Sequence, residues 1–115
     1  MNCFVIGGTG TVGALVVGRL ASLGHRVHVA TRDPARIGAL PEGGRAVAFQ
    51  LERVSAADFA GVDRVFCMVP RGVALSRDQE ASLVSALSGA RVTRVVLMTG
   101  LGVDRALGSP LHRLE

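Results

Sequence analysis

The hydrophobic positions of this chain alternate between short runs and helical spacing. Five short segments predict β-strands, at residues 2–6, 26–31, 46–51, 64–69 and 93–98. Four of them are mostly apolar, and in 26–31 the apolar residues Val27 and Val29 lie on one face. Between them the apolar spacing becomes helical, over 11–23, just after 33, at 55–60 and over 78–88. Strands that alternate with helices predict a parallel sheet with right-handed crossovers. We therefore expect an α/β fold, a doubly wound parallel sheet of the Rossmann type with five strands in the order 3-2-1-4-5.

The predicted helices have apolar stripes and recognisable ends. The stripe of the first helix comprises Leu15, Val16, Leu20 and Leu23. In the last helix we expect three residues to face inward, Leu83, Val84 and Leu87. Asp33 precedes Pro34, which is typical of a capping side chain followed by the first helical position.

Composition indicates one globular domain. The chain has 115 residues, of which 49% are hydrophobic and 19% are charged. No apolar run approaches the roughly 20 residues that a membrane span needs. The N-terminus has no basic segment or cleavage site typical of a signal peptide, so the sequence predicts a cytoplasmic protein without a membrane partner.

The net charge of +4 comes with thirteen basic residues, all of them arginine. They are scattered along the chain without a basic block, which argues against nucleic acid as a partner. Cys3 and Cys67 fall in predicted strands, where we expect them to be small buried hydrophobes. Their spacing is not that of metal ligands, so no metal site is predicted.

A glycine-rich turn lies directly between the first strand and the first helix. Gly7, Gly10 and Gly13 satisfy G-x-x-G-x-x-G, whereas Gly8, Gly10 and Gly13 satisfy G-x-G-x-x-G. Such a turn lets the backbone approach a pyrophosphate, and the helix start directs N–H groups at it. A tight turn without a ligand is the alternative. The residues expected at the phosphates are Gly7, Thr9, Gly10, Thr11, Val12 and Gly13.

The end of the second strand distinguishes between dinucleotides. NAD-selective folds place an acid there for the ribose 2′-hydroxyl. Here Arg32 follows Thr31, nineteen residues after Gly13, and Arg36 comes one helical turn later. A guanidinium pairs with a 2′-phosphate. We therefore expect NADP(H) rather than NAD(H), with Thr31, Arg32 and Arg36 in the site; an ordinary exposed arginine is the alternative for Arg32.

With this glycine turn and this second strand, the chain resembles the NmrA-like family of atypical short-chain dehydrogenase/reductases. The resemblance rests on five segments, 5–13, 24–27, 31–34, 61–66 and 95–100. It implies an NAD(P)-binding domain followed by a smaller C-terminal substrate region. Some members reduce quinones or other carbonyl compounds, and others are redox sensors that regulate partner proteins. We expect residues 1–115 to be the NAD(P)-binding domain without the usual C-terminal portion.

The resemblance assigns roles to further residues and also shows departures. Gln50 stands where the family often has an acid near adenine. Val69, Pro70 and Thr99 are expected to line the ribose and nicotinamide, and Thr99 takes the place of the family's Ser/Thr. The usual catalytic Tyr and Lys are absent. His112, thirteen residues after Thr99, is the candidate general acid, with an exposed tail residue as the alternative.

Three functional hypotheses follow. The first is an NADP(H)-binding oxidoreductase-like domain that transfers hydride to a quinone or another carbonyl substrate. The second is a non-catalytic NAD(P) sensor that binds a protein partner, which the missing Tyr and Lys favour. The third is an inactive fragment whose exposed apolar surface leads to a homodimer or requires a missing segment.

Overall fold

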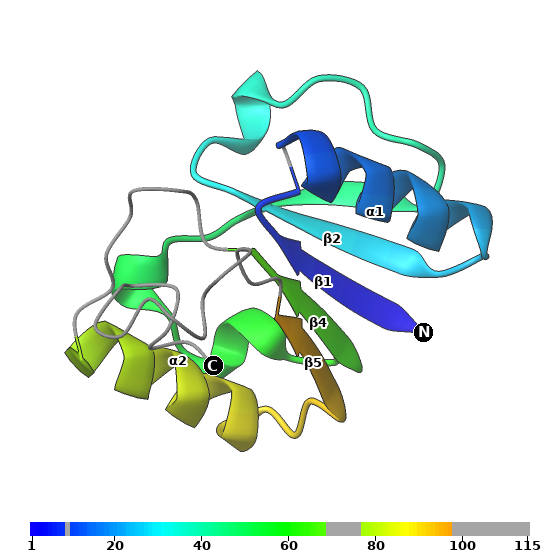
Figure 1. Cartoon of the computed structure of the whole chain (residues 1–115). Helices are drawn as coiled ribbons and strands as arrows, with labels where there is room; N and C mark the ends of the chain where they lie inside the picture. The colour runs from blue at the N-terminus through cyan, green and yellow to red at the C-terminus, as the bar shows by residue number, and fades with distance from the viewer. Residues whose placement is uncertain (9, 69–76, 98–115) are drawn as a thin grey trace, which may run out of the picture.

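A computed structural model of the chain shows a parallel sheet of five strands (Figure 1). The structure describes residues 1–8, 10–68 and 77–97. The strand order is β3-β2-β1-β4-β5, which confirms the predicted doubly wound order 3-2-1-4-5. The strands are β1 Asn2–Ile6, β2 Arg26–Thr31, β3 Gly44–Ala48, β4 Arg64–Cys67 and β5 Arg94–Leu97. Several predicted site residues lie outside the described residues: Thr9, Val69, Pro70, Thr99 and His112.

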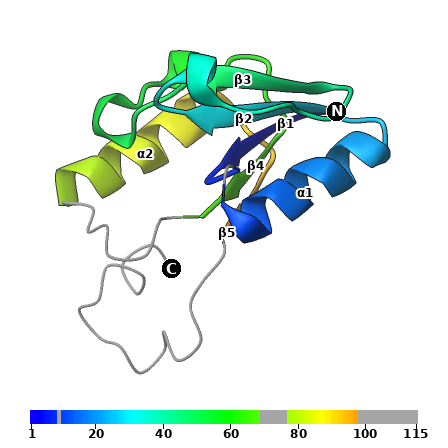
Figure 2. The same ribbon diagram turned by 90° about the horizontal axis from the view of Figure 1, so that it is seen from above.

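Two α-helices cover opposite faces of the sheet (Figure 2). They are α1 Thr11–Ser22 and α2 Arg77–Gly89. Three short 3₁₀ helices complete the connections, η1 Pro34–Arg36, η2 Leu51–Arg53 and η3 Ala56–Phe59. Among the described residues, neither α-helix has the length and apolar character that crossing a bilayer requires.

The strand residues alternate between two apolar clusters, one on each face of the sheet. On the α1 face, Val5 packs with Val17, Val27 and Val29. On the α2 face, Phe4 lies among residues of η3 and α2. The ring centroid of Phe4 is 5.3 Å from that of Phe49 and 5.0 Å from that of Phe59, both in edge-to-face geometry. Both faces of β1 are therefore buried from Cys3 to Ile6, which explains why these four residues are all apolar.

Strand β3 begins and ends earlier than the predicted range 46–51. Its parallel register pairs Val27 with Gly44 and Thr31 with Ala48. The N–H of Phe49 still donates to the carbonyl of Thr31 at 2.9 Å, but β2 ends there. Because no partner strand continues, the chain leaves the sheet and forms η2. The partner strand, and not the apolar run alone, sets the length of β3.

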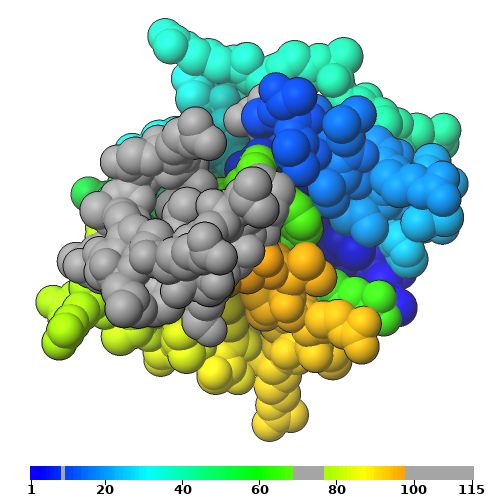
Figure 3. Space-filling view, in the orientation of Figure 1, coloured from blue at the N-terminus to red at the C-terminus, as the bar shows by residue number. Residues whose placement is uncertain are grey.

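The apolar stripes of both helices are narrower than predicted. In α1, Val16 and Leu20 pack against the cluster of Val5, Val17, Val27 and Val29, as predicted. However, Leu15 is 72% exposed and Leu23 is 57% exposed, because the buried residues of α1 are Gly13 and Val17. Figure 3 shows α1 (blue) and β5 (orange) at the surface on the same side of the molecule. In α2, Leu83 is buried as predicted, but Val84 is 62% exposed. The second buried residue of α2 is Ala86, and Leu87 is partly buried against the same cluster, as predicted.

Candidate functional site

The glycine turn lies at the carboxyl end of β1, where the chain enters α1. Gly7 has φ +87°, and its carbonyl accepts a hydrogen bond from the N–H of Gly10 at 3.2 Å. A Cβ on Gly7 would lie 2.8 Å from the carbonyl oxygen of Met68, and a Cβ on Gly13 only 2.0 Å from that of Gly7. The first turn of α1 is therefore packed directly on the backbone of the loop, as close approach to a pyrophosphate requires.

Gly10 differs from the other glycines of this turn. A Cβ on Gly8 would meet Val29 at 2.8 Å, so packing against β2 excludes a larger residue there. Among the described residues, the nearest atom to a Cβ on Gly10 would be the carbonyl oxygen of Gly7, at 3.6 Å. Internal packing thus accounts for Gly7, Gly8 and Gly13 but not for Gly10. A glycine at position 10 instead leaves room for a ligand close to the backbone.

Helix α1 begins without a capping side chain. Its N-cap is Gly10, whose carbonyl accepts from the N–H of Ala14 at 2.9 Å. Among the described residues, no side chain caps this end, and the first turn contains no acid. Thr11 and Val12 are exposed. The positive end of the helix dipole is consequently open to an anion.

A cleft of about 460 Å³ joins the glycine turn to the end of β2. Its lining comprises Gly8, Ala14, Thr31, Arg32, Asp33, Arg36, Ile37, Gly38, Ala39 and Leu40. Three predicted site residues, Thr31, Arg32 and Arg36, therefore lie together beside the turn. Gln50 is exposed at the start of η2 and does not line this cleft.

Each arginine of the cleft is paired with a carboxylate. Arg32 Nη2 donates to Glu52 Oε1, and Arg36 Nε lies 3.4 Å from Asp33 Oδ2. Asp33 Oδ1 also accepts from the N–H of Ala35 at 3.1 Å, which confirms Asp33 as the cap of η1. A backbone hydrogen bond and the guanidinium of Arg32 lower the pKa of Glu52. The two positive charges are partly balanced before any ligand arrives.

Sequence reasoning missed two residues of this region. Met68 supports the loop, because its carbonyl lies under Gly7. Glu52 contacts Arg32, twenty residues away in the chain. The contact of Glu52 with Arg32 could have been predicted from the parallel pairing of the second and third strands, because this pairing brings the segments after both strands to one edge of the sheet.

Sequence comparison identifies the ligand class of this arrangement. The sequence model of a family described as NAD(P)H-binding matches residues 7–115. The chain belongs to this NAD(P)H-binding family. No curated protein sequence matches it.

Solved structures share the fold of this chain. The oxidoreductase ylbE from Lactococcus lactis is 19% identical, with a TM-score of 0.73 over 99% of this chain and 56% of its own. A Rossmann-fold NAD(P)-binding family protein from Shigella flexneri is 21% identical, with a TM-score of 0.71 over 98% and 57%. MoeE5, in complex with UDP-glucose and NAD, is 25% identical, with a TM-score of 0.70 over 90% and 38%. The NAD(P)H-binding chain thus spans about half the length of such proteins, or less.

Neither cysteine of the NAD(P)H-binding chain is a candidate nucleophile. Both are free and buried in the sheet, as predicted. Burial raises the pKa of Cys67 to about 11 and also raises the pKa of Cys3. Both thiols are therefore protonated near neutral pH. Within residues 1–8, 10–68 and 77–97, no cluster of three or more His, Cys, Asp or Glu could hold a metal ion.

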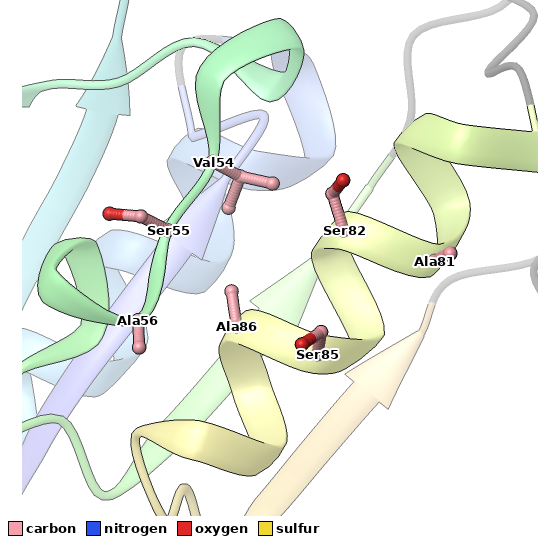
Figure 4. A pocket seen from close by; sticks show the side chains of 7 residues that line it. All are labelled: Val54, Ser55, Ala56, Ala81, Ser82, Ser85 and Ala86. Atoms are coloured by element: carbon pink, nitrogen blue, oxygen red, sulfur yellow. The ribbon is translucent and has the colours of Figure 1, made fainter.

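A second cleft, of about 380 Å³, lies between the segment before η3 and helix α2 (Figure 4). Val54 and Ala86 come from its two walls. Its other lining residues are Ser55, Ala56, Ala81, Ser82 and Ser85. None of these described residues is charged, so this cleft has no group to balance the phosphates of a dinucleotide. The cleft beside the glycine turn is the better site.

Proposed function

We propose that this chain is the NADP(H)-binding domain of an NmrA-like oxidoreductase. The observation that carries the proposal is the cleft that Gly8 of the glycine turn lines together with the two arginines after β2. The open backbone at Gly10 and the uncapped start of α1 suit a pyrophosphate. A dinucleotide bound there extends its adenosine ribose toward Arg32 and Arg36, whose guanidinium groups suit a 2′-phosphate.

The preference for NADP(H) rests on these arginines and not on the similar structures, since MoeE5 is in complex with NAD. The side chain of Arg32 is 72% exposed and that of Arg36 is 88% exposed, so both can turn toward a ligand that replaces their carboxylate partners. Asp33, the one acid among the described residues that line the cleft, is held as the cap of η1. It is therefore poorly placed to take the role of the acid that holds a ribose 2′-hydroxyl in NAD-selective folds.

The reaction class proposed is reduction of a quinone or another carbonyl compound. Bound NADPH supplies the hydride, and the protein contributes binding, orientation and electrostatics. The chain contains no Tyr and no Lys for the usual proton transfer. Thr99 is the residue proposed to polarise the carbonyl, with His112 as proton donor and with Thr9, Val69 and Pro70 as further cofactor contacts.

The absence of Tyr and Lys also favours a second candidate function. In this alternative the domain binds the dinucleotide without turnover and reports its level to a protein partner. Purified chain mixed with NADPH and a panel of quinones and aldehydes distinguishes the two functions. Steady oxidation of NADPH supports the reductase, whereas tight binding without oxidation supports the sensor.

Calorimetric titration with NADPH and with NADH tests the cofactor site directly. We expect Arg32→Ala to weaken NADPH binding by about tenfold or more, because a hydrogen-bonded charge pair with the 2′-phosphate is lost. NADH binding should change by less than about twofold, since NADH has no 2′-phosphate.

Arg19→Ala is the matched control, because it removes the same charge from the last turn of α1, at the end away from the glycine turn. It should leave both titrations unchanged, since exposed charges farther apart than about 10 Å are screened. Equal losses of NADPH and NADH binding in Arg32→Ala would contradict the 2′-phosphate assignment.

A further inference from the structure

The ends of β2 and β3 bring an acid to the arginine that the proposed function assigns to the 2′-phosphate. Thr31 and Ala48 are paired at the last position of the two strands. Arg32 follows directly, and Glu52 lies in η2 beyond β3. Arg32 Nη2 donates a hydrogen bond to Glu52 Oε1. The contact joins two segments through the strand register and not through sequence proximity.

This contact uses a donor that a phosphate also needs. A guanidinium binds phosphate most strongly through two neighbouring N–H groups at once. With Nη2 engaged by Glu52, one of these groups is taken. A 2′-phosphate that uses the same edge of the guanidinium must displace the carboxylate, and at another edge it meets a positive charge that Glu52 already partly balances. Because the pKa of Glu52 is lowered, the carboxylate is ionised throughout the neutral range and the competition persists there.

We propose that Glu52 is a specificity-determining residue of the cofactor site, which competes with the 2′-phosphate for Arg32 and so narrows the preference for NADP(H) over NAD(H). The proposal rests on the proposed function, because it takes Arg32 as the 2′-phosphate ligand. It assigns Glu52 an effect on one cofactor only. NAD(H), which has no 2′-phosphate, does not have to break the ion pair.

The expected size of the effect follows from the exposure of the pair. The Arg32 side chain is 72% exposed and the Glu52 side chain is 45% exposed. Ion pairs this exposed are weak and only partly formed in solution. Removing the competitor should therefore tighten binding of a 2′-phosphate by about two- to fivefold. If Glu52 competes with the phosphate, its removal increases the affinity for the 2′-phosphate. If Glu52 instead holds Arg32 in place, its removal decreases that affinity.

The experiment compares adenosine 2′,5′-bisphosphate with adenosine 5′-monophosphate by calorimetry. The two probes differ only in the 2′-phosphate and contain no nicotinamide. In Glu52→Gln we expect about two- to fivefold tighter binding of the bisphosphate and no change for the monophosphate. Glu42→Gln is the matched control, because Glu42 is an exposed acid in the turn before β3, at the opposite end of the strand. It should change neither titration.

The double variant Arg32→Ala/Glu52→Gln completes the test. If Glu52 acts through Arg32, its substitution has no effect on bisphosphate binding once Arg32 is absent. Weaker or unchanged bisphosphate binding in Glu52→Gln would overturn the competition while Arg32→Ala still discriminates between the probes. Equal effects of Arg32→Ala on both probes, or no binding of either to the unaltered chain, would instead overturn the proposed function and this inference with it.

Discussion

At the residue scale, Gly10 and Gly13 are three positions apart in one turn but are needed for different reasons. A Cβ at position 13 would lie 2.0 Å from the Gly7 carbonyl oxygen, far inside contact distance. A Cβ at position 10 would meet no atom closer than 3.6 Å in the part of the chain that the structure describes. Gly13 is therefore required by the fold, whereas Gly10 is available to the ligand.

Alanine at each position separates these two requirements. We expect Gly13→Ala to reduce the free energy of unfolding by about 3 kcal/mol, because the loop and helix must move apart. Gly10→Ala should reduce it by less than about 1 kcal/mol, the modest cost of a poorer N-cap. Urea unfolding measures both values. In calorimetry, Gly10→Ala should still weaken NADPH binding by about tenfold, because the methyl group displaces the pyrophosphate. Affinity like that of the unaltered chain would contradict close approach at Gly10.

A site residue can be predicted from the sequence when its side-chain chemistry and its position next to a strand or helix are enough to assign its role. The glycine spacing between a strand and a helix predicts the phosphate turn, and Arg32 is predicted because it follows the second strand. Glu52 has no such local signal. Its contact with Arg32 depends on the pairing of Thr31 with Ala48, and a one-residue shift in that register would move it.

At the element scale, the order and type of the strands follow from the sequence, but their ends and the helix faces do not. The apolar run at 46–51 continues past β3, because Phe49 belongs to the aromatic cluster of the core and not to the sheet ladder. Val84 has the spacing of an inward residue, yet α2 turns Leu83 and Ala86 toward the sheet. Packing against neighbouring elements decides where β3 ends and which face of α2 turns inward. This packing cannot be read from a single sequence.

The pairing of β2 with β3 also predicts a pH dependence. The register places Arg45 opposite His28, and Arg26 lies two residues earlier on the same face of β2. Burial, followed by the charges of Arg45 and Arg26, lowers the pKa of His28. The unfolded chain therefore binds more protons between this lowered pKa and the ordinary value of about 6.5. The stability contribution is complete above about pH 6.5 and is lost as the pH falls through the lowered pKa.

Thermal unfolding between about pH 5 and pH 7.5 measures this effect, because most carboxylates titrate below that range. We expect the Tm to fall with the pH in the unaltered chain and the slope to flatten in His28→Gln. His25→Gln is the matched control, since His25 lies in the turn before β2 and outside the sheet. If His28→Gln leaves the slope of Tm against pH unchanged, the imidazole of His28 is not the cause of the pH dependence.

At the scale of the whole molecule, the proposed dinucleotide contacts several elements of the fold at once. The cleft spans the glycine turn, the start of α1, the end of β2 and the segment after η1. Segment 37–40 packs at the margin of the α1-side cluster through Ile37 and Leu40. A ligand that contacts all of these elements binds only the folded chain and consequently stabilises the fold as a unit.

Thermal denaturation with and without dinucleotide tests this coupling. At about one hundred times its Kd, NADPH should add about 2.7 kcal/mol to the free energy of unfolding. For a chain of 115 residues, this corresponds to a rise in Tm of about 8–15 °C. NADH at the same concentration should give a smaller rise, and Arg32→Ala should bring the NADPH shift down to the NADH value.

The logarithmic dependence of the Tm shift on NADPH concentration separates binding to the folded state from a general salt effect, which should be equal for both dinucleotides. A shift of the same size with NADPH and NADH in the unaltered chain would show that the arginines after β2 do not select between them.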